Sequence, residues 1–173
     1  MAQHAFTELL NNAIDHSEGQ FVTVSLRQTP AHAQLLVSDD GRGLFDKIKE
    51  GFEIDDPAMA MLELSKGKLT SAPAHHTGRG LYFTSRLADV FDLHANAVAF
   101  QHREWDPRSW KQARAMRQQG SAIYLAISLD TARTLDEVMR SASLDSQGYA
   151  IDRTTLPLRL IASEDVALES RAQ

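Results

Sequence analysis

Three stretches of the chain alternate apolar and polar residues, as strands do when one face of a sheet is buried. They cover residues 22–26, 35–37 and, most regularly, 121–129. The turn residues at 29–32 predict an antiparallel hairpin between the first two. Asp39 continues the face of Leu35 and Val37, so its carboxylate is expected on the apolar side, where carboxylates are rare unless they are bonded or functional.

Helical periodicity predicts a first helix over residues 3–17, in which apolar residues recur at the 3.6-residue spacing. Glu8, Asn12 and Asp15 form a polar stripe along one edge of its apolar arc. A stripe beside a core face is half-buried. This suits a helix that reads a ligand, and it also suits ordinary boundary residues.

Further helices are expected over residues 44–51, 56–67, 80–89 and 134–144. Asp56 before Pro57 is a helix start signal, and Thr134 with Glu137 forms a capping box. Two strands with a turn near Asn96 are expected over 90–105, a loop or short helix over 106–119, and a last strand over 156–160. This order predicts a two-layer α/β sandwich, with a mixed, mostly antiparallel sheet and helices on one face.

Composition narrows the function classes. The 173 residues are 43% hydrophobic and 24% charged, as in an ordinary globular protein. There is no cysteine, which excludes disulfides and thiolate metal sites. The net charge of −5 argues against a nucleic-acid surface, and no apolar run approaches a membrane span. We therefore expect no membrane, no direct nucleic-acid contact, and a cytoplasmic location.

Two glycine motifs offer candidate chemistry. In Asp39-x-Gly41-x-Gly43, the carboxylate can accept a hydrogen bond from an exocyclic amine, and the glycines let the backbone approach a flat ligand. Residues 77–81 open a helix, where backbone amides can bind phosphate. Each motif taken alone is also typical of a plain turn. The second motif is not a dinucleotide-binding loop, because Phe83 stands where a glycine is required and no strand is predicted before it.

The polar stripe would complete such a site. The amide oxygen of Asn12 is a suitable hard ligand for a magnesium ion that also takes phosphate oxygens and water. One turn earlier, Glu8 would face the terminal phosphate, where a carboxylate can orient or deprotonate a water or a hydroxyl. The paired His75 and His76 are interpreted as solvated loop residues. Trp105 and Trp110 are interpreted as residues that pack in the fold or contact a partner.

In this order and spacing, the motifs resemble the ATP site of the GHKL superfamily, which includes gyrase, Hsp90, histidine kinases, MutL and anti-sigma-factor kinases. Glu8 and Asn12 resemble the N-box, Asp39 to Gly43 the G1 box, and Gly78 and Gly80 the G2 box. Gly120-Ser121 resembles the Gly-Thr that supports the adenine-binding aspartate. The resemblance implies Mg²⁺ and ATP as cofactors, Glu8 as catalytic residue and Asn12 as metal ligand. The implied nucleotide-binding residues are Asn12, Asp39, Gly41, Gly43, Leu44, Thr77, Gly78, Arg79, Gly80, Leu81 and Ser121.

The resemblance also implies a domain plan. Residues 1–130 would be the ATP-binding domain, with an ATP lid at about 44–76, and 131–173 a helix–strand extension leading to a downstream domain. This extension resembles the segment that joins such ATPases to a STAS-like domain in certain bacterial regulatory proteins, which often carry an upstream regulatory region. The chain is accordingly interpreted as a fragment of a longer protein.

Three functions remain open at this point. The first is a serine/threonine-type protein kinase or ATPase, with Glu8 as base. The second is a nucleotide-gated switch with little or no turnover, because no second catalytic residue can be identified. The third, one arm of a DNA-dependent machine, has no support from the acidic charge.

Overall fold

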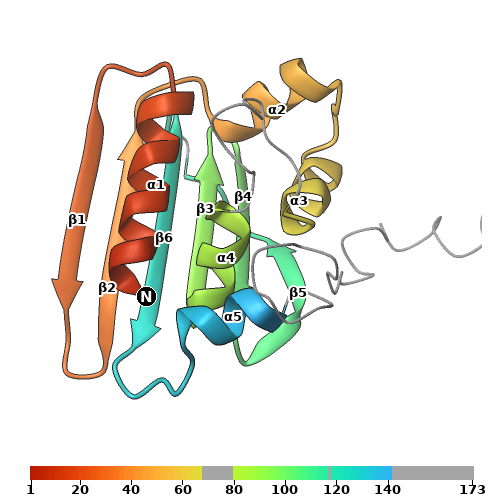
Figure 1. Ribbon diagram of the computed structural model, residues 1–173. Helices are drawn as coiled ribbons and strands as arrows, with labels where there is room; N and C mark the ends of the chain where they lie inside the picture. Colours follow the sequence, from red (N-terminus) through yellow and green to blue (C-terminus); the bar gives the residue numbers. More distant parts are fainter. Residues whose placement is uncertain (68–79, 117, 142–173) are drawn as a thin grey trace, which may run out of the picture.

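A single sheet with helices on one face organises the molecule (Figure 1). The computed structural model describes residues 1–67, 80–116 and 118–141, and only the backbone of 107–109. In this part of the chain the helices are α1 (Ala2–His16), α2 (Leu44–Phe52), α3 (Pro57–Ser65), α4 (Gly80–Leu87) and α5 (Leu135–Ser141). The strands are β1 (Val22–Gln28), β2 (His32–Asp39), β3 (Val90–Ala95), β4 (Val98–Arg103), β5 (Asp106–Gln112) and β6 (Ser121–Ser128). The expected two-layer α/β sandwich is confirmed.

The described strands lie in the order β1-β2-β6-β3-β4-β5, and every pairing among them is antiparallel. The last strand therefore inserts beside the first hairpin, and Val37 lies between Val24 on one side and Ile123 on the other. Asp39 shares this face with the buried Leu35 and Val37, as the alternation predicts. The insertion of β6 brings Ser121 to the end of β2, beside the site.

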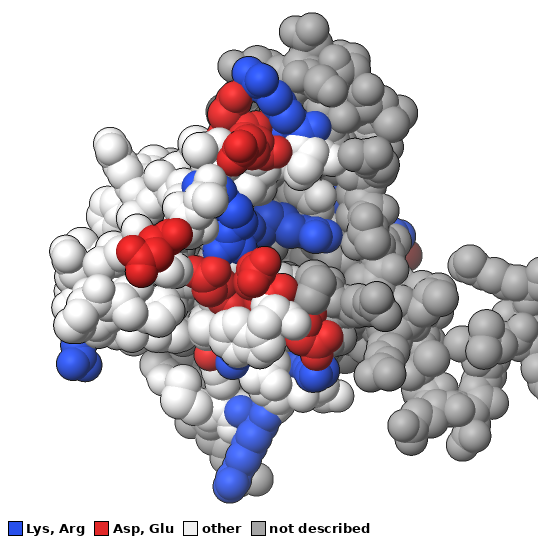
Figure 2. Space-filling model, turned by 90° about the horizontal axis from the view of Figure 1, so that it is seen from below, with Lys and Arg blue, Asp and Glu red and all other residues white. Residues whose placement is uncertain are grey.

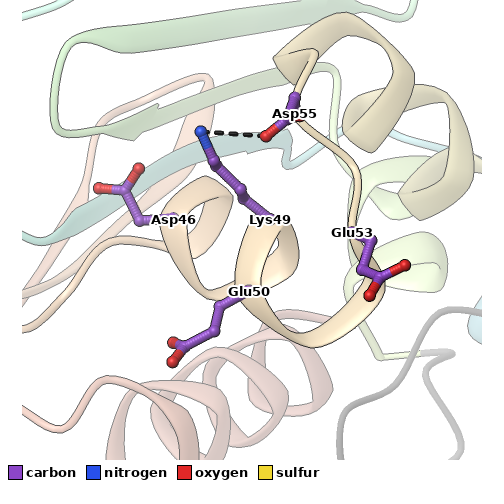
Figure 3. A pocket seen from close by; sticks show the side chains of 5 residues that line it. All are labelled: Asp46, Lys49, Glu50, Glu53 and Asp55. Carbon is purple, nitrogen blue, oxygen red and sulfur yellow. Dashed lines mark ion pairs between the residues drawn. The ribbon is translucent and has the colours of Figure 1, made fainter.

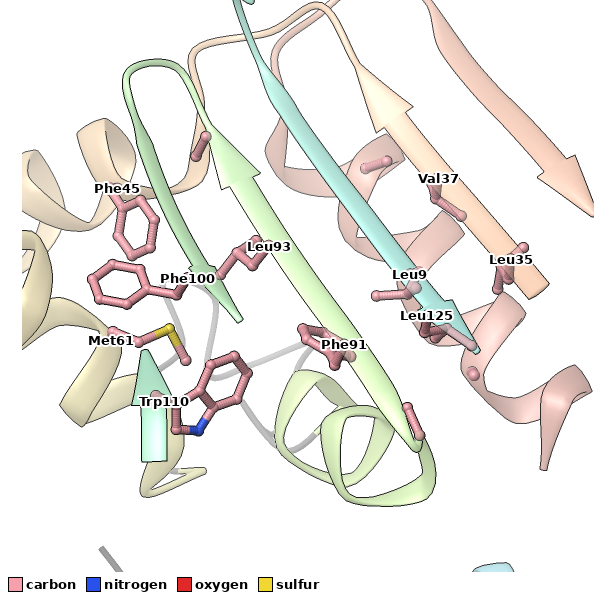
Figure 4. Close-up of a cluster of buried hydrophobic side chains, with 14 of the residues drawn as sticks. Leu9, Leu35, Val37, Phe45, Met61, Phe91, Leu93, Phe100, Trp110 and Leu125 are labelled. Carbon is pink, nitrogen blue, oxygen red and sulfur yellow. The ribbon is translucent and has the colours of Figure 1, made fainter. Parts of the chain in front are cut away.

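The core fills the space between the sheet and the helices (Figure 4). Ala5, Leu9 and Ala13 of α1 pack mainly over β2. Phe45 of α2 meets Phe100 of β4 edge-to-face, with ring centroids 5.4 Å apart. α2 and α3 are thus anchored to the sheet by buried side chains, so residues 44–67 of the expected lid belong in large part to the folded core.

The prediction for residues 106–119 is wrong, because Asp106–Gln112 form strand β5, paired with β4. Trp110 of this edge strand is buried and packs on Phe91, with ring centroids 5.6 Å apart. A single apolar residue among charged neighbours gives no visible alternation, and for that reason the pattern did not reveal the strand. Trp105, in contrast, is 68% exposed.

Local start signals are confirmed where they are described. Asp56 Oδ1 accepts a hydrogen bond from Ala58 N at 2.9 Å, and Pro57 opens α3. Thr134 and Glu137 exchange the reciprocal bonds of a capping box. The strand expected at 156–160 lies outside the described residues. None of the described helices is both long and apolar enough to cross a membrane.

Candidate functional site

The carboxylate of Asp39 is fixed at the end of β2. The residue is 8% exposed, and its Oδ1 accepts hydrogen bonds from Gly41 N at 3.0 Å and from Ser121 N at 3.1 Å. Within the described residues Oδ2 has no hydrogen-bond partner. A buried carboxylate that is held through one oxygen has its other oxygen available for a donor on a ligand.

Two glycines allow the chain segments around Asp39 to approach closely. A Cβ atom on Gly41 would lie 2.0 Å from the backbone oxygen of Ser17, at the end of α1. A Cβ atom on Gly120 would lie 2.0 Å from the backbone oxygen of Asp39, and Gly120 also has a φ of +90°. Neither contact leaves room for a side chain, because backbone atoms cannot move aside. The glycines at these positions are therefore required by packing.

Asn96 is a site residue that the sequence analysis identified only as a turn. Its Nδ2 donates to Arg42 O at 2.8 Å, and its Oδ1 accepts from Gly120 N at 2.9 Å. Asn96 has a φ of +52°, a conformation that asparagine tolerates better than most residues. Its side chain thus ties the loop after Asp39 to the start of β6. In the sequence, the only signal for this role was the residue type, because asparagine tolerates a positive φ.

The loop 41–43 is also tied to α2 and β6. Ser121 Oγ accepts a hydrogen bond from Leu44 N at 3.0 Å, and Gly43 leads into α2 with a φ of +86°. Leu44 itself packs against the main core. These contacts join Asp39, Gly41, Gly43, Leu44 and Ser121 into one connected group. Their role in binding a nucleotide stays a prediction.

Glu8 and Asn12 lie at the other side of the site and are much less constrained. Both are half-buried on α1, and neither side chain has a hydrogen-bond partner within the described residues. A Cβ atom on Gly80 would lie 2.0 Å from Glu8 Oε2, which places the start of α4 directly against this carboxylate. Leu81 packs against the main core. Thr77, Gly78 and Arg79 lie outside the described residues.

Charges around the first loop hold the end of α1 in place. Lys47 Nζ donates to His16 O at 2.7 Å and pairs with Glu18 at 3.0 Å, and Arg42 bridges Glu18 to Glu50. The Lys47 ammonium, and then Arg42, lower the pKa of Glu18. Backbone amides of Phe21 and Gln20 lower the pKa of Asp40. These contacts fix the chain between the polar stripe and Asp39.

A depression of about 500 Å³ beside α2 is a different feature (Figure 3). It is lined by Asp46, Glu50, Glu53 and Asp55, with Lys49 paired to Asp55 at 3.0 Å. Four carboxylates around one paired lysine repel a phosphate chain. A nucleotide is therefore not expected to bind there.

The comparisons with known proteins assign most of the chain to a family. Residues 1–131 match the model of the family described as histidine kinase-, DNA gyrase B-, and HSP90-like ATPase. No curated protein matches the chain. The family match spans about three quarters of the 173 residues. The chain therefore belongs to the histidine kinase-, DNA gyrase B- and HSP90-like ATPases, and is an ATP-binding domain of this GHKL type.

Proposed function

We propose that this domain binds Mg-ATP and uses it as an ATPase or serine/threonine-type protein kinase within a bacterial regulatory protein. The observation that carries the proposal is the contact between Glu8 and Gly80. It brings a carboxylate that has no partner among the described residues to the N-terminus of a helix, where the backbone amides favour phosphate. The proposed general base, Glu8, and a phosphate-binding element, the start of α4, are thus neighbours.

At the adenine end, Asp39 would accept a hydrogen bond from the exocyclic amine of adenine through Oδ2. The hydrogen bonds from Gly41 and Ser121 to Oδ1 keep this carboxylate oriented before the ligand arrives. Recognition by a preorganised buried group discriminates strongly, because a ligand lacking the amine leaves the carboxylate unpaired.

At the phosphate end, Glu8 would accept a proton from a water or from a substrate hydroxyl as it attacks the terminal phosphate. The residues present fit a magnesium ion. Asn12 has a half-buried amide with no partner in the described residues, and the described residues contain no cluster of acidic or histidine side chains that could hold a metal unaided. A site with one amide ligand from the protein suits a magnesium ion that is held partly by the phosphates of ATP. The ion would reduce the negative charge of these phosphates.

A second function, a nucleotide-gated switch with little or no turnover, is favoured by one observation. The helix α5 packs on α4, where Val138 contacts a small cluster with Tyr82, Phe83 and Leu87. Because α4 begins at Gly80, a shift of α4 on phosphate binding would be felt at α5 and at the chain that follows. The two functions differ in whether the bond to the terminal phosphate is cleaved at an appreciable rate. An ATPase releases this phosphate and a kinase transfers it, whereas the switch largely retains it.

Turnover by wild type and by Glu8→Gln separates these functions. If Glu8 is the base, Glu8→Gln lowers phosphate release by about 100-fold or more, in the range of lost general-base catalysis, while ATP affinity is unchanged. The matched control is Glu104→Gln, on the exposed turn after β4, which should leave both quantities unchanged. Slow turnover that is equal in wild type and Glu8→Gln would favour the switch.

The proposed partners rest on the sequence alone. A STAS-like domain in cis, or an upstream regulatory domain, would be the receiver or the source of the signal. Phosphate transfer to a serine or threonine of such a domain would distinguish a kinase from an ATPase. Incubation with γ-labelled ATP and the longer protein, followed by mass spectrometry of the acceptor, tests this directly.

A further inference from the structure

The two edges of the sheet differ in how they are protected against pairing with another strand. β5 contains a proline and charged residues, namely Asp106, Pro107, Arg108 and Lys111, and its pairing with β4 is interrupted by a bulge. Prolines, charges and bulges are the usual means of blocking an edge. β1 is regular over all seven residues of its pairing with β2 and has one charged residue, Arg27. Of the two edges formed by the described strands, the β1 edge is therefore the one suited to pairing.

Large apolar side chains are exposed beside the β1 edge. Leu26 is 72% exposed, Phe21 70% and Ile14 63%, and Phe6 and Val24 are also exposed. Val24 and Leu26 pair with Val37 and Leu35, so they point to the face that α1 covers. Phe21 precedes Val22, so by alternation its side chain lies on the other face. We call Phe6, Leu10, Ile14, Val24 and Leu26 the β1 patch.

The position of α1 explains why the β1 patch is uncovered. α1 packs mainly over β2, and β1 extends beyond it at the left of Figure 1. Phe6, Leu10 and Ile14 recur every four residues on the flank of α1 opposite to Glu8 and Asn12. α4 packs on α1 but lies on the other side of it from β1 in Figure 1. Seen from below, this left part of the molecule is mostly uncharged, whereas charged groups gather toward the middle (Figure 2).

We propose that β1 is a homodimer interface, in which it pairs antiparallel with β1 of a second copy. A two-fold axis at Ser25, the middle residue of β1, pairs all seven residues of the strand. Val24 then faces Leu26 of the partner subunit, and Thr23 faces Arg27 of the partner subunit. The interface is self-complementary, as a two-fold interface requires, and no like charges oppose each other.

The helices fit the same arrangement. With α1 over β2 in each copy, the two α1 helices would be roughly 14 Å apart, three strand spacings. Direct helix packing needs about 8–10 Å, so a groove remains above the two β1 strands. The side chains of the β1 patch point to this groove from both copies and are large enough to fill it. Antiparallel helices centred on Leu10 bring Phe6 near Ile14 of the partner subunit.

The size of the surface suits a dimer of moderate affinity. A standard interface covers about 800 Å² of each partner. The paired edge would be roughly 24 Å long for seven residues, and a phenylalanine such as Phe6 can bury roughly 150–250 Å². The apolar side chains and the strand edge together reach that scale, and the site around Asp39 and Glu8 stays open because it lies on the other flank of α1.

Cysteine cross-linking tests the register. The chain has no cysteine, so an introduced one is unique. In the proposed dimer the two Ser25 Cα atoms are about 4.5–5.5 Å apart, within the range of a disulfide. Ser25→Cys should form a covalent dimer under mild oxidation. Thr23→Cys, on the same face, should not, since the two cysteines would be roughly 13 Å apart along the strands.

Sedimentation of the 173-residue chain at tens of micromolar tests the interface itself. Wild type should be a dimer, Leu26→Lys a monomer, and the matched control Trp105→Lys, at the opposite edge, a dimer. A monomeric wild type would overturn the proposal and leave the edge for a strand of a different protein. A dimeric Leu26→Lys, or equal cross-linking of Thr23→Cys and Ser25→Cys, would also overturn it.

Discussion

The adenine end and the phosphate end of the proposed site are built in opposite ways. Around Asp39, the hydrogen bonds of Gly41, Ser121 and Asn96 fix the segment after β2 and the start of β6, and two glycines contact backbone atoms. Glu8 and Asn12 have no partners among the described residues, and the glycine that approaches Glu8 contacts only its flexible side chain. The proposed recognition residue is thus preorganised, whereas the proposed catalytic residue and metal ligand are left for the ligand to engage.

The same substitution at both ends gives the sharpest test of this difference. In Gly120→Ala the new methyl group would overlap the backbone oxygen of Asp39, and the residue would have to keep a φ of +90°. The conformation alone costs roughly 1–2 kcal/mol. We expect a loss of ATP affinity of more than 10-fold together with a lower melting temperature, measured by calorimetric titration and thermal unfolding.

Gly80→Ala should behave differently, because the nearest atom is Oε2 of Glu8, the end of a flexible side chain. Glu8 can rotate away, so stability should change by less than about 1 kcal/mol. ATP turnover should nevertheless fall by at least 10-fold, because the carboxylate leaves its position. Steady-state phosphate release and thermal unfolding measure the two quantities. If Gly80→Ala is as unstable as Gly120→Ala, the two ends do not differ as described.

Ser121→Ala tests a single hydrogen bond at the adenine end of the proposed site. The variant leaves Leu44 N without its acceptor, while Ser121 N still donates to Asp39. The loss of one such bond costs about 1 kcal/mol, which corresponds to a roughly 5-fold weaker ATP affinity if the loop 41–43 loosens. Thr at this position should restore binding because it keeps the hydroxyl. An alanine variant with normal affinity would show that the loop is held without Ser121.

His102 belongs to neither end of the proposed site, so its substitution should affect stability only. Burial, and then the nearby charges of Arg86 and Arg103, lower the pKa of His102 from 6.5 to about 4. Below pH 6.5 the unfolded chain takes up a proton that the folded chain does not, so stability falls as the pH drops from 6.5 toward 4. The slope is at most about 1.4 kcal/mol per pH unit.

Denaturant unfolding between pH 7.5 and 4.5 measures this effect. His102→Phe preserves a ring against Trp110, which lies 5.3 Å from His102 between centroids, and should flatten the pH dependence. ATP affinity at neutral pH should equal that of wild type. A variant whose stability depends on pH as steeply as that of wild type would assign the acid sensitivity to other groups.

The sequence predicted local patterns better than it predicted the arrangement of the sheet, and the roles of the site residues stay predictions. Alternation identified the buried face of Asp39, and helical spacing identified the Glu8–Asn12 stripe, because both are local patterns. The strand order is non-local, and the sequence of β5 has one large apolar residue, Trp110, among charged and polar neighbours, so neither was visible. The role of Asn96 was missed because its partners, Arg42 and Gly120, are brought to it only by the fold.

The measurement that tests the central claim most directly is calorimetric titration of ATP and ADP, with and without magnesium, on wild type and Asp39→Asn. Asparagine keeps the size of the side chain but changes an acceptor pair into an amide, so the fold should persist, which circular dichroism would verify. Saturable binding to wild type that is lost in Asp39→Asn is the predicted result. Equal binding by both proteins, or none by folded wild type, would contradict a nucleotide site organised around Asp39.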